Sequence, residues 1–212
     1  MRRRSLKQIK SAFDKYRELV RTDPRGDHSG FLLELLSRGV SEEERVLLES
    51  TLVSEYQRRE RFGDAEEILK RHARGNGSHP YPHIALAEHF HYFDIDRRKA
   101  LSHIAVAIRK TQRTREFGYQ ALGVQARLAV ETKQWHLLKQ TIAALTQYRH
   151  KTGRPDVFPE TDFLARIPRG KVPAHVVGQY ERRVHYLRKI GYSTLTGRST
   201  RTRASARRLA QR

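Results

Sequence analysis

Apolar side chains recur at spacings of three and four residues through the first 150 residues of the chain, which is the period of a helix with one buried face. Eight segments share this pattern, and they begin near residues 5, 31, 42, 64, 84, 100, 117 and 135. Ser41 followed by Glu44 predicts a capping box at the start of the third helix. Because no segment of useful length shows the strict alternation of a half-buried strand, the pattern predicts an all-α fold.

The composition of the sequence changes after residue 150. Glycine and proline crowd residues 151–172, which predicts an irregular connector with a short helical turn near Phe163. Residues 173–192 predict a C-terminal helix with an apolar side, made of Val176, Val177, Tyr180, Val184 and Leu187. Residues 193–212 are rich in Ser, Thr and Arg and lack the apolar content for order, so we expect a flexible basic tail. The part before the connector, residues 1–150, is expected to form one helical domain.

Two signatures recur along this helical domain. A small or apolar residue stands early in the second helix of a pair at Ala65, Ala100 and Leu138, at spacings of 35 and 38 residues. The first helices share a residue pair followed three positions later by a third residue, as in Leu52-Val53 with Tyr56, Leu86-Ala87 with Phe90, and Leu122-Gly123 with Ala126. Over residues 42–150 these signatures resemble the tetratricopeptide repeat family. The third unit departs from the family pattern at Ala126, where an aromatic residue is expected, and at Leu138, where a small one is expected.

The resemblance implies both a fold and a way of binding. Antiparallel helix pairs would stack into a short right-handed α-solenoid, because one pair cannot bury its apolar face alone, and the first and last helices would cap the stack. First helices would line a groove for a protein partner, with six side chains in it: Ser54, Arg58, Glu88, His91, Gln120 and Arg127. Arg58 and Arg127 would then clamp a carboxylate or phosphate of the partner. The alternative is that all six are ordinary solvated residues.

The charge of the chain lies mostly in its second half. The formal net charge is +20; residues 1–100 contain 20 basic and 17 acidic side chains, whereas residues 101–212 contain 23 and 6. This asymmetry predicts an acidic partner for the C-terminal end. The candidate contacts on the C-terminal helix and tail are Arg182, Arg183, Arg188, Lys189, Arg198, Arg201, Arg203, Arg207 and Arg208.

Tyrosines are interleaved with these basic residues. Tyr180, Tyr186 and Tyr192 recur at six-residue spacing among the arginines. Aromatic rings among cations suit base stacking combined with phosphate contact, which predicts RNA or DNA as the acidic partner. The alternative is that the tyrosines pack against the helical domain and that the tail only adds solubility.

The residue content argues against several other classes. The chain has no Cys, which excludes disulfides, thiolate metal sites and a cysteine nucleophile. It has neither a Gly-x-Ser-x-Gly elbow nor a phosphate-binding Gly-rich motif ending in Gly-Lys, so we expect no enzyme, no cofactor and no small-molecule substrate. Six histidines lie between His72 and His103, but no pair shares a helical face with a carboxylate in a ligand pattern. We therefore expect packing or surface histidines and no metal site.

The sequence also carries expectations for location and function. No apolar run reaches the roughly 18 residues that cross a membrane, and the arginines at positions 2–4 are not followed by the apolar stretch of an export signal, so we expect a cytoplasmic protein. The leading interpretation is a non-catalytic scaffold or adaptor that holds a protein partner in a helical-repeat groove. The alternative is an RNA- or DNA-binding protein whose basic C-terminal region contacts phosphates.

Overall fold

The computed structural model describes residues 2–75, 77–153 and 159–189, and these residues confirm the all-α fold. They form helices that pack against their neighbours in sequence, and none of them is in a β-strand. Contacts divide the chain into a first unit, residues 1–76, and a second unit, residues 77–212. Consecutive packing of this kind is compatible with a helical-repeat fold. The single repeat domain over residues 1–150 stays a prediction.

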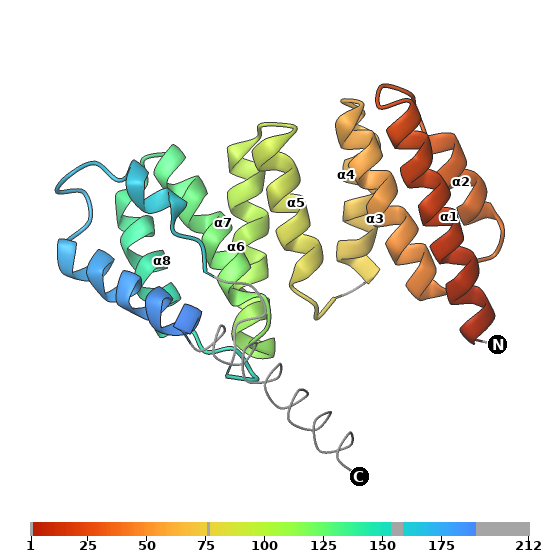
Figure 1. Cartoon of the computed structure of the whole chain (residues 1–212). Helices are drawn as coiled ribbons and strands as arrows, with labels where there is room; N and C mark the ends of the chain where they lie inside the picture. Colours follow the sequence, from red (N-terminus) through yellow and green to blue (C-terminus); the bar gives the residue numbers. More distant parts are fainter. Residues whose placement is uncertain (1, 76, 154–158, 190–212) are drawn as a thin grey trace, which may run out of the picture. The chain divides into compact units, whose positions relative to one another are not determined.

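The first unit holds four helices (Figure 1): α1 (Arg2–Thr22), α2 (Ser29–Ser37), α3 (Glu42–Arg58) and α4 (Phe62–Gly75). Helix α3 packs against both α2 and α4, and its fully buried Leu48 and Leu52 lie in the core. The predicted capping box is confirmed at its start. The Glu44 amide donates to the Ser41 hydroxyl at 3.3 Å, and the Ser41 amide donates to the Glu44 carboxylate at 2.9 Å.

The second unit holds four further helices: α5 (Tyr81–Tyr92), α6 (Arg97–Thr114), α7 (Gly118–Glu131) and α8 (Trp135–Gln147). Each packs against the next, and α5 also packs against α7, the first helix of the following pair. The connector contains the short 3-10 helix η1 (Asp162–Arg166), which confirms the predicted turn near Phe163. A last helix over residues 174–189 completes the described part of this unit (Figure 1).

The turns from α3 to α4, from α5 to α6 and from α7 to α8 share a non-glycine residue with a positive φ. Glu60, Ile95 and Lys133 stand in these turns with positive φ of 58°, 51° and 56°. Five residues after each one lies a side chain that is fully buried, namely Ala65, Ala100 and Leu138. These are the residues of the second-helix signature, so the sequence repeat coincides with a local structural repeat.

The connector and the last helix complete the core of the second unit. Val176, Tyr180, Val184 and Leu187 are buried on one side of the last helix, where they join Phe163 of η1 and apolar side chains of α7 and α8. The predicted apolar side of the C-terminal helix is thereby confirmed at these four positions. The opposite side of the helix is left exposed to solvent.

Gly118, the first residue of α7, lies directly against the ring of Tyr148. Its amide donates to the Tyr148 hydroxyl at 3.2 Å, and a Cβ atom built on Gly118 would lie 2.1 Å from a ring carbon. We expect Gly118→Ala to lower the free energy of unfolding by about 1–3 kcal/mol, because the ring must move out of a packed position. Urea unfolding followed by the fluorescence of Trp135, the only tryptophan, measures this change in the second unit.

A matched control lies five residues further along the same helix. A Cβ atom on Gly123 would lie 3.5 Å from its nearest neighbour, the Glu160 carboxylate carbon, which is an ordinary contact. We expect Gly123→Ala to raise stability by about 0.5–1 kcal/mol, because alanine favours the helix more than glycine does. Equal effects of the two substitutions would contradict the packing described for Tyr148.

Candidate functional site

The four groove residues predicted in the second unit lie on α5 and α7, and the structure brings three of them together. Arg127 forms ion pairs with Glu160 of the connector and, at 3.7 Å, with Glu88, while Gln120 hydrogen-bonds the Glu88 carboxylate. The Arg127 side chain is only 16% exposed. Burial raises the pKa of Glu88, although Arg127 and Gln120 oppose this.

The fourth groove residue, His91, belongs to a second cluster. Its Nε2 atom lies 2.8 Å from a carboxylate oxygen of Glu131, which also pairs with Arg97 at 3.7 Å and with Arg166 of η1 at 3.4 Å. Burial raises the pKa of Glu131, but hydrogen bonds from His91 and Arg166 outweigh it and hold the pKa below its usual range. Both clusters therefore pair groove residues with acids of the chain and bind the connector to α7.

The two groove residues of the first unit lie on α3. The Ser54 hydroxyl donates to the carbonyl of Ser50 in the preceding turn, and the residue is exposed. Arg58 pairs with the buried Glu55 at 2.5 Å and donates to the carbonyls of Pro24 and Gly26. Arg58 thus holds the α1–α2 loop of its own unit.

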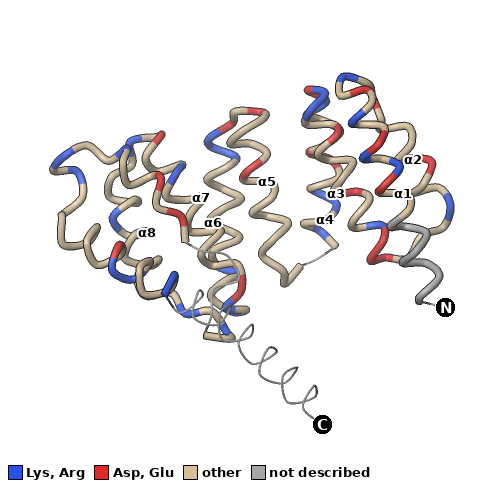
Figure 2. The backbone as a smooth tube through the Cα atoms, viewed as in Figure 1, with Lys and Arg blue, Asp and Glu red and all other residues tan. Residues whose placement is uncertain are grey.

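The basic candidates on the last helix are placed differently. Arg182, Arg188 and Lys189 are exposed and form no ion pair with a described residue. The Arg183 guanidinium lies 5.4 Å from the ring centre of Tyr186, which is 54% exposed. In Figure 2 the blue of Lys and Arg outweighs the red of Asp and Glu along this helix. The other predicted contacts, Arg198, Arg201, Arg203, Arg207 and Arg208, lie outside the described residues, as does Tyr192.

Tyr180 is part of the hydrophobic core of the second unit. It is fully buried, its hydroxyl donates to the carbonyl of Glu160 at 2.6 Å, and its ring stacks on Phe163. Burial raises its pKa, so the hydroxyl stays protonated. Of the two interpretations of the interleaved tyrosines, packing applies to Tyr180, while Tyr186 presents its ring to solvent.

Helix α6 contributes cations that the sequence analysis did not single out. Arg98, Arg109 and Arg113 are exposed and have no ion pair with a described residue. The first two are eleven residues apart, about three helical turns, and Arg113 follows one turn later, so the three share one face. The signal was present in the sequence, since α6 contains no acidic residue at all. Helix α6 and the last helix together contain six exposed cations that form no ion pair with a described residue.

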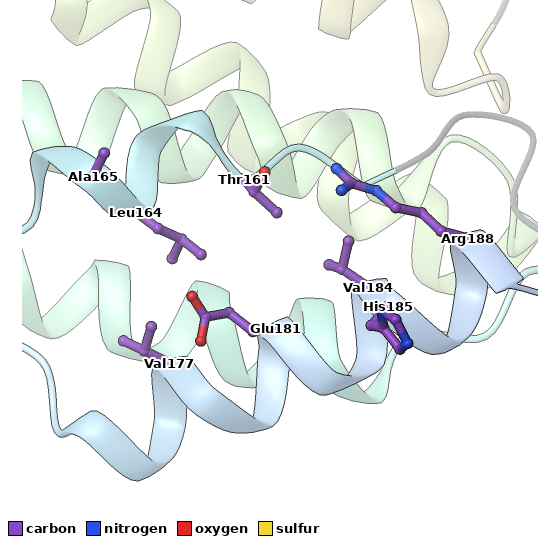
Figure 3. A pocket seen from close by; sticks show the side chains of 8 residues that line it. All are labelled: Thr161, Leu164, Ala165, Val177, Glu181, Val184, His185 and Arg188. Atoms are coloured by element: carbon purple, nitrogen blue, oxygen red, sulfur yellow. The ribbon is translucent and has the colours of Figure 1, made fainter.

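An open pocket of about 540 Å³ lies between η1 and the last helix (Figure 3). Its residues are Thr161, Leu164, Ala165, Val177, Glu181, Val184, His185 and Arg188. In Figure 3 the side chains of Leu164 and Glu181 point toward one another, and the Arg188 guanidinium reaches toward Thr161. The pocket was not predicted, because it exists only once the connector folds back onto the last helix.

The histidine cluster is engaged in packing. His83 and His103 place their Nδ1 atoms 3.3 Å apart, His103 stacks on Phe90, and His89 is fully buried. Within the described ranges, no group of three or more histidine, aspartate or glutamate side chains could hold a metal ion. The cluster also contains a partly buried histidine, His83, whose pKa is shifted.

Burial, together with the positive charges of Lys110, His103 and Arg109, lowers the pKa of His83 to about 4. The unfolded chain binds this proton near pH 6.5, so the free energy of unfolding should fall as the pH drops from about 6.5 to about 4 and change no further below it. Because the ring is partly exposed, we expect a loss on the order of 1–2 kcal/mol. Urea unfolding across this range should show a shallower pH dependence for His83→Gln than for the wild type. The exposed His175→Gln serves as the control, and equal slopes for His83→Gln and the wild type would contradict the prediction.

Neither family models, curated protein sequences nor solved structures give a match to this chain. No helix among the described residues is both long and apolar enough to cross a membrane.

Proposed function

We propose that the chain is a non-catalytic nucleic-acid-binding protein, built as a tetratricopeptide-like helical repeat, whose basic second unit contacts the phosphate backbone of RNA or DNA. The observation that carries this proposal is the set of six exposed cations on α6 and the last helix that have no ion pair with a described residue. Exposed Lys and Arg side chains that form no ion pair can neutralise phosphates and release the counterions of a polyanion. The exposed Tyr186 adds a ring for stacking beside Arg183.

The predicted groove residues favour nucleic-acid binding over the protein-binding groove, which is the leading interpretation of the sequence. Arg58 and Arg127 already bind carboxylates and carbonyls of their own units. A partner would have to displace these contacts and separate Arg58 from the buried Glu55, or Arg127 from the partly buried Glu160, which costs free energy. The unpaired cations of the second unit can bind phosphates without breaking any described contact.

The test compares two triple variants that lose the same net charge. Arg182→Gln/Arg188→Gln/Lys189→Gln removes unpaired cations of the last helix. Arg17→Gln/Arg38→Gln/Lys70→Gln removes cations that pair with Asp14, Glu34 and Glu66 in the first unit. At about 0.1 M salt we expect the first variant to bind a labelled oligonucleotide at least about tenfold more weakly, and the second to bind as the wild type does. Equal weakening of binding by both variants would show that affinity depends only on net charge, and would contradict a contact made by the last helix.

A protein-binding scaffold remains the second candidate, and one observation favours it. Tyr92, Phe93 and Ile95 form an exposed apolar turn between α5 and α6, and Ile95 is 63% exposed with a positive φ of 51°. A β-branched residue is strained in this conformation, and the equivalent turns carry the polar Glu60 and Lys133. Retaining Ile95 there suits an apolar anchor for a protein partner. Ile95→Asn should then raise the melting temperature but weaken a co-purifying protein complex, and a complex of unchanged strength would exclude this role for the turn.

A further inference from the structure

The pocket between η1 and the last helix combines two kinds of wall. Leu164, Val177 and Val184 give it apolar surfaces, whereas Glu181 and Arg188 bring opposite charges to it (Figure 3). Its volume of about 540 Å³ lies in the range of roughly 300–1,000 Å³ that is typical of pockets for small ligands. Half of its eight lining residues are apolar and half are polar or charged, which suits a flat, heteroaromatic ring that carries hydrogen-bonding edges.

Glu181 is the feature that needs an explanation. It is exposed, lies on a helix whose neighbouring charges are basic, and forms no hydrogen bond or ion pair with a described residue. Against a phosphate backbone such a carboxylate is repulsive, so it does not serve the contact proposed for Arg182 and Lys189. A carboxylate is acceptor-only, and it accepts hydrogen bonds from the exocyclic amino groups of bases.

We propose that this pocket receives one unstacked base of a single-stranded nucleic acid, with Glu181 accepting from an exocyclic amino group and Arg188 contacting an adjacent phosphate. The assignment rests on the proposed function and adds to it a strand type and a base preference. Arg182, Tyr186 and Lys189 follow one another on the exposed face of the same helix at four- and three-residue spacing. They offer the neighbouring nucleotides two cations and a ring beside the pocket.

The first experiment fills the pocket. Thr161→Trp places an indole at its wall, and the Thr161 side chain makes no capping hydrogen bond that the substitution would remove. Gln147→Trp adds the same ring at an exposed position of α8 and is the control. By fluorescence anisotropy with the full chain, we expect Thr161→Trp to bind a labelled oligocytidine about tenfold more weakly and a duplex DNA of equal length as the wild type does. Unchanged thermal unfolding shows that the variant is folded.

The second experiment reads the base preference. Cytosine carries an exocyclic amino group and uracil does not, so the wild type should bind oligocytidine about tenfold more tightly than oligouridine of the same length. Glu181→Gln removes the carboxylate and should bring the two affinities together, even though the loss of a negative charge strengthens binding of both. The ratio therefore reports the base contact and not the charge.

The outcomes separate the two proposals. Binding of single strands and duplexes alike, with no effect of Thr161→Trp and a cytidine-to-uridine ratio near one, overturns the pocket assignment and leaves the proposed function standing. Failure of every oligonucleotide to bind at about 0.1 M salt overturns the proposed function, and the pocket assignment with it.

Discussion

Replacing Glu55 with alanine should unfold the first unit far more readily, with a loss of about 3–5 kcal/mol in the free energy of unfolding. Glu55 is buried on α3 and holds three parts of the unit at once. It pairs with Arg58 at 2.5 Å, accepts from the Tyr16 hydroxyl of α1 at 2.9 Å and accepts from the His28 amide of the α1–α2 loop at 3.1 Å. Burial raises the pKa of Glu55, but these hydrogen bonds outweigh it and lower the pKa, so the carboxylate is charged at neutral pH.

The loss is large because removing one partner strands the others. The Tyr16 hydroxyl and the partly buried His28 amide would lose their acceptor, and Arg58 and Arg59 would lose their counter-charge. Urea unfolding by circular dichroism measures the change, and hydrogen exchange in peptides from α1 and α3 localises it. Glu34→Gln is the control, since Glu34 pairs with Arg38 on the exposed face of α2 and its loss should leave the transition in place. A Glu55→Ala chain as stable as the control would contradict the role given to this residue.

The second large effect is expected at Tyr180, where alanine should cost about 3–5 kcal/mol. The side chain is fully buried between α7, α8 and η1, and it hydrogen-bonds the connector at Glu160. Truncation leaves a cavity and removes the packing and the hydrogen bond that hold the last helix against the rest of the second unit. Tyr180→Phe removes only the hydroxyl and should cost about 0.5–1.5 kcal/mol. Trp135 fluorescence during urea unfolding reports both.

Tyr186 gives the matched comparison on the same helix. Its ring is exposed, so Tyr186→Ala should leave the unfolding transition nearly unchanged and weaken oligonucleotide binding through lost stacking. The two tyrosines thus separate stability from binding. If Tyr180→Ala left stability unchanged, or if Tyr186→Ala destabilised the chain as strongly as Tyr180→Ala, the result would contradict the orientation described for the last helix.

Local features of the fold could be predicted from the sequence, because they depend on residues close together in the chain. The helical periodicity, the capping box at Ser41, the turn near Phe163 and the apolar side of the last helix are of this kind. The acids that pair with the predicted groove arginines, Arg58 and Arg127, could not be predicted in this way. Glu55 stands between apolar positions of α3, and Glu160 lies in an irregular connector, so nothing in their local pattern reveals which arginine each will meet. The open pocket also depends on a long-range fold-back and has no sequence signature.

The salt dependence of nucleic-acid binding tests the central claim most directly. Nuclease-treated protein is titrated with a labelled single-stranded oligonucleotide over a series of salt concentrations. If most of the six exposed, unpaired cations of α6 and the last helix contact phosphates, the logarithm of the binding constant should fall linearly with the logarithm of salt concentration, with a slope of about −3 to −4. A slope near zero, or no binding at about 0.1 M salt, would contradict the assignment of this surface to a nucleic-acid backbone.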